Sequence, residues 1–163
     1  MAETLSVTDM LPNRFEPKRQ YRWIMAIEGI DSFLVKSTAR PTITLGTTEI
    51  PFINSYRKLS GKLKFGSLSV NLYDPIAPSG AQQVMEWIRT HYESVSGRAG
   101  YADFYKRDIQ LKMLDPVGTV IEMWDMKGAF ITNATFNSLD YGGGEDPMMI
   151  NLTLEFDNCV LQY

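Results

Sequence analysis

The chain has 163 residues, of which 44% are hydrophobic and 21% are charged, and its formal net charge at pH 7 is −3. This composition predicts a single globular domain that buries roughly 70% of the surface exposed by its unfolded chain, and it excludes a coiled coil or a disordered protein. A protein that grips nucleic acid through its phosphates is expected to be basic, so the acidic balance argues against stable duplex binding.

The cysteine count and the hydropathy pattern bound the cellular setting. Cys159 is the only cysteine, so no disulfide can form within the chain, which is typical of proteins that fold in a reducing compartment. The polar, acidic residues 1–9 and the lack of a long apolar run predict neither a secretory signal peptide nor a membrane-spanning segment.

The first third of the chain predicts an irregular arm followed by extended structure. Prolines, asparagine and charges over residues 1–20 indicate an N-terminal arm, and residues 21–163 form the predicted β domain. Residues 21–28 and 32–36 read as a first hairpin that turns at Gly29. Two prolines limit residues 42–53 to edge or irregular extended structure.

Residues 54–65 carry four cations, Arg57, Lys58, Lys62 and Lys64, around the sequence Leu59-Ser60-Gly61. This pattern predicts a protruding hairpin that turns at Gly61. A solvated loop and a docking element for acidic groups of another chain are both compatible with it. Acidic residues near the N-terminus and over residues 140–146 favour docking between copies of this chain, head to tail.

Three predicted strands alternate apolar side chains with short, mostly uncharged polar ones. They span residues 66–75, 130–137 and 148–157. An ordinary half-buried strand turns charged residues and threonine to water, so three faces of serine, asparagine and threonine indicate a particular wet surface. The polar members of these faces are Ser67, Ser69, Asn71, Asn133, Thr135, Asn137, Asn151, Thr153 and Glu155.

One amphipathic helix is predicted between the strands. Ser79 is its expected N-cap, with Gln82 in capping-box register, and Gly97 is its expected stop. Its apolar stripe comprises Val84, Trp87, Ile88, His91, Tyr92 and Val95. Strands over residues 109–114 and 119–127 and the late pair follow it. The predicted fold is mainly β (α+β), a β-barrel or sandwich with one packed helix.

Candidate catalytic and metal sites have plainer explanations. His91 is the only histidine and lies on the apolar helix stripe, so a packed or capping role is more typical than catalysis. Cys159 reads as a small buried hydrophobic residue. The acidic, glycine-rich loop over residues 140–147 lacks the ligand pattern of an EF-hand and of a phosphate cradle. No cofactor and no metal ion is expected.

The chain resembles tail tube proteins of contractile-tailed bacteriophages. The resemblance is carried by four features: the stretch Gly-Thr-Thr-Glu-Ile-Pro-Phe-Ile-Asn-Ser-Tyr-Arg-Lys-Leu-Ser-Gly over residues 46–61, Phe65, the strand over residues 68–74 and the helix around Trp87. The resemblance covers most of the chain beyond its first twenty residues. It implies a ring-forming barrel like that of the related type VI secretion tube, with rings of six that stack into a tube. In this family an extended loop crosses the ring interface, and residues 54–65 match its position.

The resemblance implies a structural virion protein without enzymatic activity, assembled in the host cytoplasm and placed in the virion tail. Implied partners are the sheath protein, baseplate and tail completion proteins, the tape measure protein and DNA in transit. The polar strand faces would line the lumen, because a neutral wall does not hold DNA. Candidate inter-ring contacts are Arg57, Lys58, Lys62, Lys64, Glu3, Asp9, Asp140, Glu145 and Asp146.

Three alternatives remain open at this point. The same pattern fits the inner tube of a bacteriocin or an injection system. A monomeric ligand-binding β-barrel of the lipocalin kind would instead have a roomy apolar interior. A hydrolase would have to use His91 and Cys159.

Overall fold

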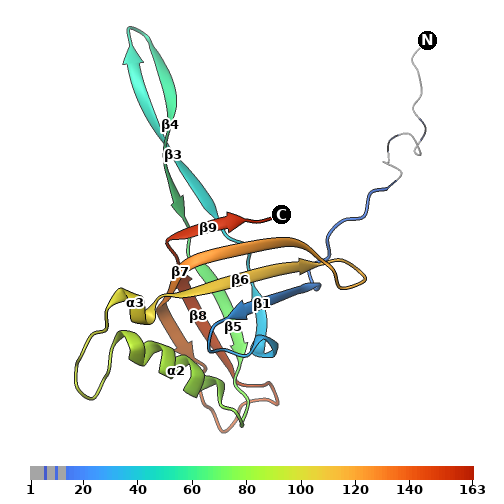
Figure 1. Ribbon diagram of the computed structural model, residues 1–163, viewed down its shortest axis with the longest axis vertical. Helices are drawn as coiled ribbons and strands as arrows, with labels where there is room; N and C mark the ends of the chain where they lie inside the picture. Colours follow the sequence, from blue (N-terminus) through green and yellow to red (C-terminus); the bar gives the residue numbers. More distant parts are fainter. Residues whose placement is uncertain (1–5, 7–9, 11–13) are drawn as a thin grey trace.

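The computed structural model describes residues 6, 10 and 14–163 and shows a mainly β protein with one long helix (Figure 1). The helical segments are η1 (Ser32–Leu34), α2 (Gly80–His91) and α3 (Ala102–Tyr105). The strands are β1 (Trp23–Ile27), β2 (Val35–Thr38), β3 (Ile43–Phe52), β4 (Ser55–Phe65), β5 (Leu68–Tyr73), β6 (Arg107–Leu114), β7 (Val120–Phe136), β8 (Met149–Glu155) and β9 (Asn158–Leu161).

Strand β7 belongs to two layers of antiparallel strands. Its first half pairs with β6 and β9, and β6 pairs with β1. Its second half pairs with β8, which continues through β5 to β2. Gly128 has a φ of +68° at the join, and a Cβ there would meet the side chain of Asp157. Glycine therefore lets β7 bend from one layer into the other.

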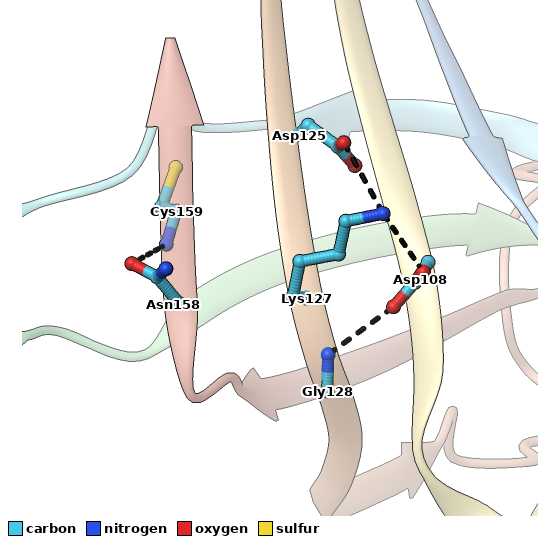
Figure 2. Close-up of polar contacts among 6 residues, drawn as sticks. All are labelled: Asp108, Asp125, Lys127, Gly128, Asn158 and Cys159. Atoms are coloured by element: carbon cyan, nitrogen blue, oxygen red, sulfur yellow. Dashed lines mark hydrogen bonds and ion pairs between the residues drawn. The ribbon is translucent and has the colours of Figure 1, made fainter.

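An ion-pair bridge holds β6 and β7 together beside this bend (Figure 2). Lys127 Nζ lies 2.9 Å from Asp108 Oδ2 and 3.2 Å from Asp125 Oδ2, and the Gly128 N–H donates to Asp108 Oδ1. Hydrogen bonding to Asp108, then to Asp125, raises the pKa of Lys127. The hydrogen bond from Lys127 lowers the pKa of Asp108. Both shifts favour the charged forms of Lys127 and Asp108.

The hydrophobic core lies between the two layers and α2. Alternate side chains of β5 and β8 enter it, as their patterns predict, together with Met25, Ile109 and Met126 from the other layer. Trp87 of α2 is also buried, and its Nε1 donates to the Tyr105 carbonyl over 2.7 Å. The prediction of a mainly β fold with one packed helix is thus confirmed.

Helix α2 begins as predicted but ends earlier. Ser79 is the N-cap residue without a side-chain cap bond, and Asp74 Oδ1 instead accepts from the Ala81 N–H over 3.1 Å. The helix ends at His91, because the chain folds back and the Gly100 N–H donates to the His91 carbonyl. Val95 is therefore 96% exposed, and the predicted stripe was wrong beyond His91.

The predicted first hairpin is wrong, and the predicted protruding hairpin is present but turns at another position. β1 pairs with β6 and β2 pairs with β5, so residues 21–36 do not form a ladder with each other beyond a bridge at the turn. Residues 54–65 form one arm of a longer hairpin, in which β3 pairs with β4. The chain reverses at Ile53, whose φ is +51°, while Gly61 faces Gly46 at an irregularity halfway along.

Candidate assembly surfaces

The predicted polar faces of β5, β7 and β8 form one continuous surface. Because these strands are neighbours, their polar residues align in rows across the sheet. One row joins Ser69, Thr153 and Asn133. The next joins Asn71, Asn151 and Thr135, and Asn71 Nδ2 donates to Ser37 Oγ of β2 over 2.8 Å. Buried leucine, valine and isoleucine lie on the opposite face.

An irregularity in β7 shifts this polar surface at the end that lies near Glu155. Between the pairs Ile131–Leu154 and Asn133–Thr153, β7 carries one extra residue, Thr132. As a result Ile131 packs against the core, whereas Phe130, an apolar residue of the predicted strand, pairs with Glu155 in the ladder and contacts the Tyr105 ring. A bulge of this kind is invisible to a strict two-residue alternation.

The remaining predicted members of the polar surface lie at its borders. Ser67 and Asn137 are exposed but fall just outside β5 and β7, and Glu155 is the last residue of β8. Phe136, predicted to be a core residue, is 42% exposed. Side chains at the border with β2 include Lys36, whose Nζ lies 5.7 Å from the centre of the Tyr73 ring. The centre of the surface is therefore neutral and hydrophilic.

The β3–β4 hairpin projects far from the two layers (Figure 1). Lys58 pairs with Glu49 over 3.3 Å, which leaves an excess of positive charge from Arg57, Lys62 and Lys64. The apolar side chains of the hairpin are exposed as well: Ile43, Leu45, Ile50, Phe52, Ile53, Tyr56, Leu59 and Leu63. A two-stranded ribbon is marginal alone, and exposed apolar groups of this extent are typical of surfaces that contact another chain.

The acidic loop over residues 137–148 lies at the other end of the long axis (Figure 1). Asp140, Glu145 and Asp146 are all exposed there. The structure thus places Arg57 and Lys58 near the tip of the hairpin and the acidic loop at the opposite pole, while Lys62 lies about halfway along the hairpin and Lys64 lies at its root. The other two acidic candidates, Glu3 and Asp9, lie outside the described residues.

The geometry does not assemble the residues of the hydrolase alternative. His91, at the end of α2, stacks on Tyr105 at 4.3 Å between ring centres, and Cys159 is on β9, which Figure 1 shows well apart from α2. Burial, then the nearby charge of Asp125, raises the pKa of the Cys159 thiol. The thiol is therefore protonated and poorly nucleophilic at neutral pH.

A buried carboxylate that sequence reasoning missed ties together the arm and the root of the hairpin. Glu122 of β7 is 5% exposed and accepts hydrogen bonds from Lys18 and from the Trp124 indole. Arg40, just before β3, lies 3.7 Å away. Burial opposes ionisation of Glu122, but hydrogen bonds from Lys18 and Trp124, with the charges of Lys18 and Arg40, hold its pKa below the ordinary value.

The part of the chain described by the structure holds no cluster of three metal-ligating side chains, and none of its helices has the length and hydropathy needed to span a membrane. No protein-family model and no curated protein matches this chain by sequence.

Solved structures match the fold closely. The chain is similar to a protein in the sheath-tube complex of the extracellular contractile injection system PVC, in the extended state, with a TM-score of 0.71 and 19% identity over 98% of this chain and 99% of that chain. It is also similar to a protein in the tube-terminating cap of the anti-feeding prophage, with a TM-score of 0.75 and 20% identity over 97% and 99% of the two chains.

A third match is Hcp1 from Flavobacterium johnsoniae, with a TM-score of 0.53 and 12% identity over 87% of this chain and 95% of that chain. These similarities extend over nearly the whole of each chain. The protein therefore has the fold of the tube proteins of contractile injection systems, as its resemblance to tail tube proteins predicted.

Proposed function

We propose that this chain is the structural subunit of the inner tube of a contractile tail or injection machine. The observation that carries the proposal is the neutral polar surface on three adjacent strands, with the core directly beneath it. When this surface faces inward in a ring, it lines the channel with neutral, hydrated groups. Such groups form no ion pairs with the phosphates of DNA, so they release no counterions and add no affinity for it. Its candidate lumen residues are those of the polar strand faces.

The borders of the same sheet supply a route to ring closure. β2 uses one edge to pair with β5, and the second half of β7 uses one edge to pair with β8. Unpaired strand edges favour association with further strands, and a closed ring removes them. Six copies per ring is the number implied by the tail tube resemblance. The basic hairpin of one ring then meets the acidic loop of the next.

The molecule that passes through the tube, and the proteins that bind around it, depend on whether the tube belongs to a phage tail or to an injection system. A phage tube would conduct DNA and carry the sheath, baseplate, tail completion and tape measure proteins as partners. The similarity to proteins in a sheath-tube complex and a tube cap favours an injection-system tube as the second candidate. Both assign the chain a structural role inside a sheath.

Negative-stain electron microscopy and sedimentation of the purified chain test the proposal. We expect rings or tubes with an open centre at high protein concentration. A species that stays monomeric at every concentration would overturn the proposal and favour a ligand-binding barrel.

Lysine substitutions in the wall test which surface faces the lumen. We expect the triple variant Ser69→Lys, Asn71→Lys and Thr135→Lys to assemble and to retain short single-stranded DNA. Binding should weaken with salt at a slope of about 0.7 per phosphate contacted. The readout is DNA co-sedimenting with tubes over a salt series.

The matched control adds the same three charges at exposed positions outside the polar surface, with Val95→Lys, Val117→Lys and Tyr163→Lys. Equal DNA retention by this control, or none by the triple variant, would place the polar surface outside the channel.

A further inference from the structure

A groove of about 1060 Å³ opens between β1 and β2, where the predicted first hairpin is missing. Both strands present an edge to it, because β1 pairs only with β6, and β2 only with β5, within the described ladders. Its accessible apolar lining includes the half-buried Trp23 and Val35 and the exposed Ile24 and Phe33. An apolar lining beside two unpaired strand edges is a surface suited to another chain.

The groove has an excess of positive charge. Lys18, Arg19, Lys36 and Arg40 line it, and no carboxylate does so within the described chain. Glu122 alone balances both Lys18 and Arg40, while Arg19 faces the exposed Glu16. The contacts of Lys36 are the Met149 sulfur and the Tyr73 ring. A partner with exposed aromatic groups and a carboxylate is therefore complementary to it.

The chain carries exposed aromatic side chains and a carboxylate on α3 and at its N-cap. Tyr101 is 81% exposed and Phe104 is 67% exposed, and their rings lie 6.3 Å apart. Asp103 stands between them in the sequence and is exposed as well. Two aromatic side chains in contact on the surface expose a large apolar area, which is typical of an interface anchor, and Asp103 adds a negative charge to the same short helix.

The aromatic group and the groove are two different surfaces of the molecule. Tyr101, Asp103 and Phe104 lie before β6, and none of them lines the groove between β1 and β2. A self-complementary dimer would use one patch twice, whereas two different complementary patches join copies head to tail and form a ring when the rotation between copies closes. This arrangement argues for a neighbouring copy of the same chain as the occupant.

We propose that Tyr101, Asp103 and Phe104 of one copy insert into the groove between β1 and β2 of the next copy, and that this contact closes the ring. The inference rests on the proposed tube function and adds the lateral contact to it. The two aromatic rings pack against Trp23, Ile24 and Phe33. Asp103 approaches the excess positive charge on the rim.

The first test is the double variant Tyr101→Ala and Phe104→Ala. Both side chains are exposed in the single subunit, so its thermal unfolding should match that of the wild type. The protein concentration at the midpoint of ring assembly should rise at least about tenfold, as expected for aromatic anchors. Val117→Ala is the matched control, since Val117 is an exposed apolar residue on neither surface.

The second test combines two defective variants. Phe33→Asp with Lys36→Glu damages only the groove, and the aromatic double variant damages only the insert. At the protein concentration at which the wild type forms rings, neither variant should form them alone. Their mixture has one intact groove facing one intact insert, so it should yield heterodimers and no rings in analytical ultracentrifugation.

These experiments distinguish an error in the proposed lateral contact from an error in the proposed tube function. If the wild type forms rings and the aromatic variant does so at the same concentration, the contact is wrong and the tube function stands. If the wild type forms no rings, the tube function falls and the contact falls with it. Rings lost in both variants but no heterodimer in the mixture would assign the groove to another occupant, such as the β3–β4 hairpin or a sheath peptide.

Discussion

The double substitution Lys18→Ala and Arg40→Ala is expected to lower the free energy of unfolding by about 3 kcal/mol. Glu122 is buried and both cations contact its carboxylate, so their removal leaves a buried charge paired only with the Trp124 indole. The expected loss is at the low end for a broken buried ion pair because both cations are about half exposed. Urea unfolding followed by circular dichroism measures it.

Adding Glu122→Gln to the double variant separates charge from packing. The amide is neutral and its oxygen still accepts from Trp124, so the triple variant should recover to within about 1 kcal/mol of the single Glu122→Gln variant. If the triple variant is as unstable as the double variant, lost packing of the two long side chains explains the effect and the electrostatic account is wrong.

The wild-type bridge also predicts a pH dependence. The pKa of Glu122 is lower in the folded chain than its ordinary value of 4.5, so the folded state favours the ionised form. The stabilisation is fully present above about pH 5 and is lost as the pH falls through the lowered pKa. The stability difference between the wild type and Glu122→Gln should therefore shrink in acid and stay constant from pH 6 to 8.

The sequence predicted the sheet best where strict alternation continues along whole strands. β5 and β8 obey it from end to end, so their buried and polar faces were assigned correctly before pairing was known. Pairing then determines which faces meet, and β5, β8 and the end of β7 are direct neighbours. The continuity of the polar surface depends on this sheet order, which alternation within a single strand does not encode.

Predictions made from turn-forming glycines were wrong where pairing between distant strands determines the structure. Gly29 favours a hairpin between β1 and β2, yet each strand pairs with a strand far along the sequence, and a groove opens between them. Gly61 likewise reads as a turn, but the ten-residue strand β3 pairs along β4 and the reversal lies at Ile53. In both cases the extended ladder outweighs the local preference of one glycine.

The buried Glu122 had a signal in the sequence. It lies in the run Val-Ile-Glu-Met-Trp-Asp-Met, where two carboxylates interrupt a strongly apolar strand. A charge on such a strand needs a cation, but Lys18 and Arg40 are both more than eighty residues away, so only the folded chain identifies them.

Reversing the charge of the hairpin is expected to abolish tubes while leaving single rings. In the variant Arg57→Glu, Lys62→Glu and Lys64→Glu, the hairpin would face the acidic loop of the next ring with like charge. An exposed ion pair is worth only about 0.2–1 kcal/mol, but every copy in a ring repeats the contact, so the ring–ring free energy changes many times over. Sedimentation should show rings in place of tubes.

A charge swap tests whether the acidic loop is the partner of the hairpin. Adding Asp140→Lys, Glu145→Lys and Asp146→Lys to the reversed hairpin restores opposite charges across the interface, so tubes should return. The loop substitutions alone should block stacking. Wild-type tubes should also dissociate into rings as the salt concentration rises. Salt screens the charges across the interface, with a Debye length of about 8 Å at physiological ionic strength.

The matched control changes the net charge equally, away from both poles, with Arg14→Glu, Arg89→Glu and Arg98→Glu. It should stack as the wild type does, because stacking depends on where the charges meet and not on their sum. If the charge-swapped chain fails to form tubes while this control succeeds, the hairpin contacts a surface other than the acidic loop. In that case the exposed apolar face of the hairpin, with Ile50 and Phe52, would have to supply the stacking energy.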